Sequence, residues 1–282
     1  MDKLLTYFRF VKIEHSIFAL PFAYIGLFLA SKGSFPFKEF LLVSLAMVSV
    51  RSFAMGMNRI LDLPFDKKNP RTKDRPLVKG EITVKEALLF VLCCAFLFVF
   101  FCWLLNPVCF KFSFFALFWA GFYSLTKRFT SLSHFWLGSV LGMAPVGGWL
   151  AYDPHFSLTQ VLLFLGVMFW VAGFDIIYAT LDVEFDKKMG LFSLPKEIGI
   201  ECALHISLFC HINASILFFL AGISASLGVF YFLTAFLVFV ILLLEHKIIS
   251  PDDLSKVNLA FFTFNGFVSV ILFLGVIGDL LK

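Results

Sequence analysis

Nine apolar stretches, each long enough to cross a lipid bilayer, take up most of the chain. A membrane-spanning helix needs about 20 apolar residues. We therefore predict spans over 15–31, 39–60, 84–105, 109–125, 134–152, 158–181, 201–222, 226–244 and 258–279. With 60% hydrophobic and only 15% charged residues, a soluble domain of this length has too little polar surface to cover its apolar side chains. The period-two alternation of membrane strands is missing. The sequence predicts an all-α, multi-span integral membrane protein with one domain over residues 1–282.

The positions of Lys and Arg orient these spans, because the cytoplasmic loops of membrane proteins carry an excess of both. With the N-terminus in the cytoplasm, most of them fall on the cytoplasmic side, and Lys32, Lys38, Lys111 and Lys282 fall outside. Nine helices with the N-terminus inside therefore satisfy this rule, and we expect them to lie in a bacterial cytoplasmic membrane. The basic segment 4–11, which precedes the first span, predicts a short helix at the membrane interface.

An acidic motif occurs twice on the predicted cytoplasmic side. Residues 61–68 read LDLPFDKK and residues 181–188 read LDVEFDKK, with six of the eight positions identical. Each copy follows a long apolar segment and carries two aspartates four residues apart. Carboxylates are costly near a bilayer and mark functional sites there. Two such pairs facing each other could hold divalent cations that bridge a diphosphate.

In the first copy, Asn58 and Asp62 share one helical face. Pro64 should bend or end the helix and place Asp66 in the following loop. Asn and Asp oxygens suit Mg²⁺, which completes its coordination with water and substrate phosphate. Arg71 and Arg75 follow, and arginine can bind phosphate through two parallel hydrogen bonds. Taken alone, this copy could equally be an acidic helix end before a positively charged cytoplasmic loop.

In the second copy, Asp175, Tyr178, Asp182 and Asp186 follow the spacing of one helix face. Asp175 lies about two turns deeper in the span than Asp182, and a carboxylate at that depth needs a partner or a metal. Ordinary surface acids would explain Asp186 but not Asp175. Glu184 points elsewhere and should be solvated.

Two basic elements accompany the acids. Tyr123 and Lys127 are four residues apart and share a face, and Arg128 follows. Lys127 could reach a phosphate, or this element could be a positively charged anchor at a helix end. Arg51 lies seven residues before Asn58, inside the second span, and needs an anion. That anion is either Asp175 or the carboxylate of a bound aromatic acid. The six His residues lack metal-ligand spacing, and the six Cys predict neither disulfides nor zinc.

Together these patterns resemble the UbiA superfamily of intramembrane aromatic prenyltransferases over essentially the whole chain. The NxxxDxxxD motif of that family is matched by Asn58, Asp62 and Asp66, followed by Arg71-Thr72 and Arg75-Pro76-Leu77. Its DxxYxxxDxxxD motif is matched by Asp175, Tyr178, Asp182 and Asp186, and its YxxxKR element by Tyr123, Lys127 and Arg128. Arg51 also matches. The chain departs after Leu77, where Val78-Lys79-Gly80 replaces the Pro-Ser-Gly that members often have.

The resemblance implies a nine-helix bundle and an enzyme of the 4-hydroxybenzoate polyprenyltransferase type. Such an enzyme uses Mg²⁺ to transfer a polyprenyl group from polyprenyl diphosphate to a small aromatic acid in respiratory quinone biosynthesis. It implies metal ligands at Asn58, Asp62, Asp66, Asp182 and Asp186, and catalytic roles for Asp62, Asp175 and Asp182. It implies substrate-binding roles for Arg51, Arg71, Arg75, Tyr123, Lys127, Arg128 and Tyr178.

Two alternatives remain open at this stage. Residues 11–22 resemble a branch in which some members prenylate 1,4-dihydroxy-6-naphthoate for menaquinone instead. From a different class, a transporter of ions or organic anions also places charged groups inside the membrane. The charged groups of this chain cluster at the cytoplasmic face, with nothing comparable opposite, which favours the enzyme. The expected partners are membrane lipid and small substrates, and not nucleic acid.

Overall fold

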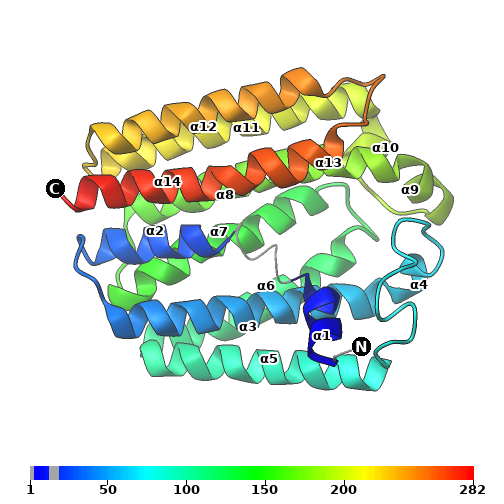
Figure 1. The fold of residues 1–282 in the computed structure, drawn as a ribbon, viewed down its shortest axis with the longest axis horizontal. Helices are drawn as coiled ribbons and strands as arrows, with labels where there is room; N and C mark the ends of the chain where they lie inside the picture. Colours follow the sequence, from blue (N-terminus) through cyan, green and yellow to red (C-terminus); the bar gives the residue numbers. More distant parts are fainter. Residues whose placement is uncertain (1–2, 13–18) are drawn as a thin grey trace.

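The computed structural model describes residues 3–12 and 19–282, and these form a bundle of long helices that run roughly along one direction (Figure 1). The long helices are α2 (Leu20–Ala30), α3 (Phe37–Leu61), α5 (Val84–Leu105), α6 (Pro107–Thr126), α7 (Ser133–Tyr152), α8 (Leu158–Ala179), α11 (Ile200–Ser224), α12 (Val229–Ile248) and α14 (Asn265–Leu280). Short elements are α1 (Lys3–Val11), α4 (Leu63–Asp66), a 3-10 turn (Thr180–Asp182), α9 (Val183–Met189), α10 (Leu194–Ile198), α13 (Val257–Leu259) and a π-helical turn (Ala260–Phe264). Within the described ranges, the β structure is one isolated bridge between Ser250 and Asp253. The all-α prediction is confirmed.

Each of the nine predicted spans overlaps one long helix, and α5 has the predicted bounds. Residues 15–18 of the first predicted span lie outside the described residues, and α2 begins at Leu20. The last predicted span is a run of three pieces, because the π-helical turn separates α13 from α14. The predicted N-terminal helix is present as α1.

Six helical segments are long and apolar enough to cross a membrane by themselves, so the chain is an integral membrane protein. They are α3, α5, α6, the continuous segment Leu158–Met189, α11 and α12. The helices α2 and α14 are apolar but shorter. The remaining long helix, α7, has 20 residues and contains four glycines and Pro145.

The glycines of α7 place this helix at the centre of the bundle. A Cβ on Gly148 would lie 1.8 Å from the carbonyl oxygen of Ala23 in α2. A Cβ on Gly26 would lie 1.9 Å from the carbonyl oxygen of Pro145. A Cβ on Gly138 would lie 2.2 Å from the carbonyl oxygen of Met168 in α8. Small residues let membrane helices approach this closely. The helices α2, α7 and α8 therefore pack with their backbones in contact.

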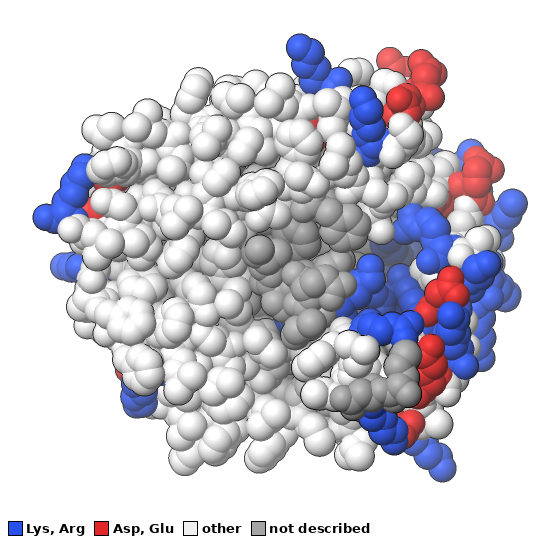
Figure 2. All heavy atoms as spheres, in the orientation of Figure 1, with Lys and Arg blue, Asp and Glu red and all other residues white. Residues whose placement is uncertain are grey.

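Charged side chains gather at one end of the molecule. Figure 2 shows Lys and Arg, with Asp and Glu among them, mainly at the end where Figure 1 places α4, α9 and α10. The sides of the bundle expose large apolar residues such as Phe96, Phe118 and Phe236, as expected for helices that face lipid. The helix α1 is tied to the same charged end by ion pairs from Lys3 to Glu86 and from Arg9 to Glu81.

Candidate active site

Both copies of the acidic motif break a long helix at their first aspartate. The helix α3 ends at Leu61, and α4 then carries Asp66. The second copy repeats this arrangement, since α8 passes through the 3-10 turn that ends at Asp182 into α9, which carries Asp186. One expectation was wrong: Asp66 lies in a helical turn and not in a loop. Pro64 is the second residue of α4, where a proline costs no hydrogen bond because the first N–H groups of a helix lack intrahelical partners.

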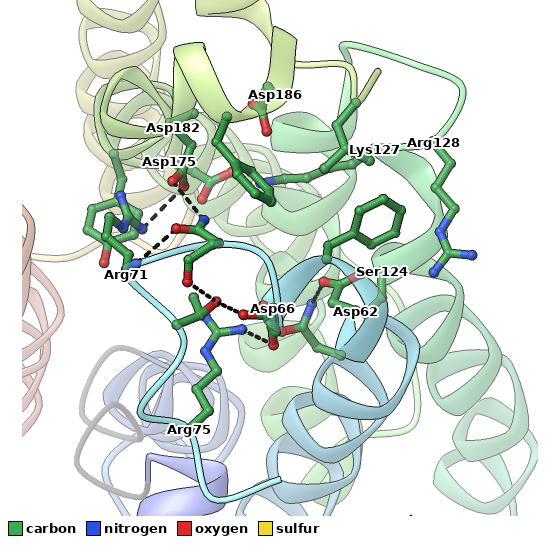
Figure 3. A pocket seen from close by; sticks show the side chains of 18 of the residues that line it. Asp62, Asp66, Arg71, Arg75, Ser124, Lys127, Arg128, Asp175, Asp182 and Asp186 are labelled. Atoms are coloured by element: carbon green, nitrogen blue, oxygen red, sulfur yellow. Dashed lines mark hydrogen bonds and ion pairs between the residues drawn. The ribbon is translucent and has the colours of Figure 1, made fainter. Parts of the chain in front are cut away.

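The two copies face each other across a polar cavity of about 180 Å³ (Figure 3). All the predicted site residues except Arg51 line it. They are Asn58, Asp62, Asp66, Arg71, Arg75, Tyr123, Lys127, Arg128, Asp175, Tyr178, Asp182 and Asp186. The structure therefore brings together side chains from both halves of the chain.

The acids of the first copy are each held by a nearby donor. The Nδ2 of Asn58 donates to Oδ2 of Asp62 at 2.7 Å. Asp66 forms an ion pair with Arg75, and its own carbonyl oxygen accepts from Thr72 Oγ1 at 2.9 Å. Burial raises the pKa of the Asp62 carboxyl to about 6, although nearby Lys127 opposes the shift. This carboxyl therefore binds a proton more readily than an ordinary aspartate does.

The loop after α4 crosses to the acids of the second copy. Arg71 Nη2 lies 3.2 Å from Asp182 Oδ2, and Asn69 Nδ2 donates to Asp182 Oδ1 at 3.3 Å. Asn69 also accepts from the backbone N–H of Arg71 at 2.9 Å. The Arg71 guanidinium lies over the Tyr178 ring, 4.9 Å from its centroid. This loop thereby ties the first half of the chain to Asp182.

The two cations after α6 differ in their contacts. Arg128 donates from Nη2 to the carbonyl oxygen of Leu61 at 2.7 Å and lies over the Phe65 ring, so it holds the end of α3. Lys127 has no ion pair among the described residues. Burial acts to lower the pKa of Lys127, but the phenol of Tyr123 and the surrounding carboxylates raise it above its ordinary value. Lys127 is therefore a charged ammonium facing the acids.

The residues fit a magnesium ion that arrives with a phosphate ligand. In the described part of the chain, no three His, Cys, Asp or Glu side chains are close enough to hold a metal by themselves. Mg²⁺ commonly takes one or two protein carboxylates and fills its octahedron with water and substrate phosphate. Asp62 and Asp182 on facing helices offer such ligands. The Ser124 Oγ, which is buried at the cavity wall, has no hydrogen-bond partner in the described structure, and a phosphate oxygen would supply one.

An apolar cavity of about 560 Å³ adjoins the polar one, and Asn58 and Tyr123 line both. It is lined by residues of α3, α5, α6, α7 and α8. Its wall includes Gln160 and Phe174, which are fourteen residues apart on α8 and hence about 21 Å apart along the helix. A polar site at the charged end of the bundle thus continues into a long apolar space.

Arg51 lines the apolar cavity and not the polar one. Its Nη1 and Nη2 donate to the carbonyl oxygens of Val11 and Lys12 at 3.1 and 2.9 Å. Of the two anions considered for Arg51, Asp175 instead lies 2.7 Å from Nδ1 of His134. The pairing of Arg51 with Asp175 is therefore wrong.

Sequence reasoning missed His134, Asn69 and Ser193. Ser193 Oγ donates to Asp186 Oδ2 at 2.7 Å. The histidines were tested only against metal-ligand spacing, which a single histidine that pairs with a carboxylate does not show. The available signal for His134 was its place at the start of α7, at the same end of the bundle as Asp175.

Comparisons with known proteins identify the family of this chain. The profile of the UbiA prenyltransferase family matches residues 19–269. A 4-hydroxybenzoate octaprenyltransferase from Methylobacillus flagellatus is 35% identical over 196 residues, which are 68% of this chain and 66% of that protein. One from Herminiimonas arsenicoxydans is 30% identical over 79% of each chain. One from Nitrosomonas europaea is 28% identical over 99% of this chain and 96% of that protein.

Solved structures give the same result for the fold. A UbiA homolog from Aeropyrum pernix K1 is 35% identical, with a TM-score of 0.86 over 95% of this chain and 98% of that chain. A UbiA homolog from Archaeoglobus fulgidus, solved with GPP and Mg²⁺ bound, is 22% identical, with a TM-score of 0.75 over 98% of this chain and 100% of that chain. Since the family profile covers most of the sequence and the fold is shared along its length, the chain belongs to the UbiA prenyltransferase family.

Proposed function

We propose that this prenyltransferase transfers a polyprenyl group from polyprenyl diphosphate to 4-hydroxybenzoate, with Mg²⁺, in respiratory quinone biosynthesis. The observation that carries the proposal is the junction of the two cavities at Asn58 and Tyr123. A charged space that holds two acidic pairs continues there into an apolar space. This suits a substrate with a diphosphate head and a long apolar tail, whose reacting carbon would lie at the junction.

The diphosphate would bind in the polar cavity. Asn58, Asp62, Asp66, Asp182 and Asp186 would hold Mg²⁺, which neutralises charge on the leaving diphosphate. Lys127, which has no ion pair among the described residues, would bind a phosphate oxygen directly, and Arg71 and Arg75 would add positive charge at the same wall. Arg128 would act through its contact with the end of α3.

The transfer step exchanges one bond to carbon for another. The allylic C–O bond breaks, and its electron pair leaves with the diphosphate. The ring carbon of the acceptor ortho to the hydroxyl forms the new C–C bond and then loses its proton to Asp175. The Tyr123 ring, which lines both cavities, would stabilise positive charge at the allylic carbon. Arg51, near the same junction, would bind the acceptor carboxylate.

The membrane arrangement follows from the same proposal. All nine long helices would cross the bacterial cytoplasmic membrane as one domain over residues 1–282, with the N-terminus and the polar cavity on the cytoplasmic side. The short helices α2 and α14 cross because they pack against longer neighbours. Leaving the isoprenoid tail in an apolar environment is favourable by about 0.8 kcal/mol per buried CH₂.

The test is a prenylation assay with the purified protein in lipid nanodiscs, Mg²⁺, a polyprenyl diphosphate and one aromatic acceptor. We expect a prenylated 4-hydroxybenzoate, loss of the product with EDTA, and recovery with added Mg²⁺. Product from 1,4-dihydroxy-6-naphthoate alone would overturn the acceptor and keep the reaction. If no diphosphate is released from any donor, the reaction itself is overturned, and ion or organic-anion transport becomes the next activity to measure.

A further inference from the structure

His134 connects Asp175 to the segment 191–194, whose first residue, Leu191, lines the polar cavity. Its Nδ1 lies 2.7 Å from Asp175 Oδ2, and its Nε2 lies 3.4 Å from the backbone nitrogen of Leu194. The imidazole is fully buried and does not line the polar cavity. It therefore lies behind the carboxylate, on the side away from the substrate.

The two contacts fix the protonation of the ring. A backbone N–H can only donate, so Nε2 must accept from Leu194 and carries no proton. The ring proton of the neutral imidazole then lies on Nδ1 and is donated to Asp175. His134 thus donates from Nδ1 to Asp175, and its two neighbours fix which ring nitrogen is the donor.

This donor leaves one Asp175 oxygen for the substrate. Oδ2 is taken by His134, while Oδ1 has no hydrogen-bond partner among the described residues. The side chain of Asp175 is 14% exposed and lines the polar cavity. An aspartate that is held through one oxygen presents the other oxygen in a fixed direction. Catalytic side chains need supporting groups that hold them in this way.

The contact with Leu194 extends the network to the rest of the site. Residues 191–194, which we name the closing segment, run from α9 to α10. The N–H of Leu191 donates to the carbonyl oxygen of Asp186 at 3.0 Å, and the N–H of Phe192 donates to the carbonyl oxygen of Lys127 at 2.8 Å. Ser193 donates to the Asp186 carboxylate at 2.7 Å. Every residue of the closing segment is therefore bonded to a site residue or to His134.

We infer that His134 is a positioning residue, which orients Asp175 toward the acceptor and couples that aspartate to the closing segment beside Asp186 and Lys127. The inference rests on the proposed function, because Asp175 is the proposed proton acceptor. In the transfer step, the proton from the acceptor ring goes to Asp175 Oδ1, while the Nδ1 proton stays on His134. His134 contacts neither substrate, so its loss acts on acceptor chemistry through Asp175 and leaves donor binding intact.

Three variants of one residue separate the two contacts. H134A removes both. H134N places an amide N–H close to the position of Nδ1, and so restores the bond to Asp175 alone. H134Q extends its amide to the position of Nε2, and so restores the bond to Leu194 alone. The measurements are kcat with saturating acceptor, the KM of the donor, and binding of the prenyl diphosphate in Mg²⁺ without acceptor.

We expect H134A to lower kcat by about 10- to 100-fold, which is part of the 10²–10⁴ that a positioned proton acceptor contributes. The donor KM and donor binding should stay within about twofold of the wild type. H134N should recover most of the lost kcat, and H134Q should not.

A wild-type kcat in H134A would overturn the inference, and so would a loss of donor binding that H134N does not restore, since the residue would then be merely structural. Equal rescue by H134Q would overturn the role of the Asp175 contact. If the wild type itself transfers the prenyl group to no acceptor, the proposed function fails instead, and this outcome is recognised before any variant is compared.

Discussion

Asp62 and Asp182 have nearly the same backbone conformation, with φ −89° and ψ 0° at Asp62 and φ −108° and ψ 4° at Asp182. Both lie in the sparsely populated bridge region, where many active-site residues occur. Each lies at the end of one helical segment and precedes a short helix whose first turn carries a second aspartate. The repeat in the sequence is therefore also a repeat in backbone geometry, and the two aspartates face one cavity.

This symmetry predicts similar losses for D62N and D182N. Each change removes one negative charge from the proposed Mg²⁺ ligands while it keeps the shape of the side chain. We expect each to lower kcat by about 10²-fold or more, the size of effect seen when one charge-stabilising group is removed from an active site. The measurement is prenyl transfer at saturating Mg²⁺, with the amount of protein in the membrane measured in parallel.

Asp74 gives a matched control, since its side chain is 70% exposed and pairs with Lys79 outside the cavity. D74N should retain wild-type activity. If D62N or D182N also did so, their assignment as metal ligands would be wrong.

Arg71 should not be replaceable by lysine. Its guanidinium contacts Asp182 and at the same time lies over the Tyr178 ring, and the compact ammonium of lysine cannot reproduce this planar arrangement. We expect R71K to raise the donor KM by about tenfold, which corresponds to about 1.4 kcal/mol. Lys73, two residues along the same loop, does not line the cavity, and K73R should leave the donor KM unchanged. Equal effects of the two changes would contradict a specific role for Arg71.

Two neighbouring glycines of α7 should respond in opposite ways. Gly147 lines the apolar cavity, and an added Cβ would meet nothing within 4 Å. G147L should therefore fold and fill the cavity, which lowers kcat/KM for long donors by about tenfold relative to short ones. The readout is a series of prenyl diphosphates of increasing length.

At Gly148 a Cβ would lie 1.8 Å from the Ala23 carbonyl oxygen. G148A should destabilise the protein by about 1–3 kcal/mol, as overpacking does, without a preference among donor lengths. A uniform loss over all donors in G147L, with G148A unaffected, would show that the apolar cavity does not hold the isoprenoid.

Arg51 can be tested with one variant and two acceptors. R51M removes the guanidinium and with it the bonds to the carbonyl oxygens of Val11 and Lys12. If Arg51 binds the acceptor carboxylate, R51M should raise the acceptor KM, measured with 4-hydroxybenzoate, by about tenfold or more, since a charged hydrogen bond contributes about 1.5–3 kcal/mol. The KM for a phenol that lacks the carboxylate should change little. Equal loss with both acceptors would mean that Arg51 acts only by holding α1 to α3.

A buried polar chain joins α8, α12 and α14 away from the cavities. Trp170 Nε1 donates to Asn265 Oδ1 at 2.7 Å, and Asn265 Nδ2 donates to Glu245 Oε1 at 2.8 Å. N265L would leave the indole N–H unsatisfied and should lower stability by about 2 kcal/mol. E245Q keeps an acceptor for Asn265 and removes the cost of burying a carboxylate, so it should be as stable as the wild type or more stable. The midpoint of thermal unfolding in nanodiscs measures the stability of both variants. An N265L variant as stable as the wild type would show that these buried hydrogen bonds contribute nothing to stability.

Much of this architecture could be predicted from local pattern. Helix positions follow from runs of apolar residues, and the acidic residues of the site follow from the spacing of the repeated motif, because both are periodic in the sequence. The pairing of His134 with Asp175 could not be predicted in this way. It joins residues 41 positions apart through the packing of α7 on α8, and such a contact produces no periodic pattern in the sequence.

The contacts of Asn69 and Arg71 with Asp182 could not be predicted for a similar reason, because they depend on the conformation of the loop after α4. The error at Asp66 came from treating Pro64 only as a helix breaker, although proline is favoured in the first turn of a new helix. The alternative that paired Arg51 with Asp175 failed because it counted charges within the spans without their positions in space.

The division of the site between residues 58–75 and 175–194 also governs how the protein can be made. A chain that has been synthesised only as far as α6 carries Asp62 and Asp66 without the opposing acids, the closing segment or His134. Its charged end must therefore stay in contact with water while the later helices are inserted. The cavity forms only when α7 and α8 have packed against the first helices. Prenyl transfer is thus possible only for a chain whose two halves have met, and activity in a membrane reports complete assembly as well as chemistry.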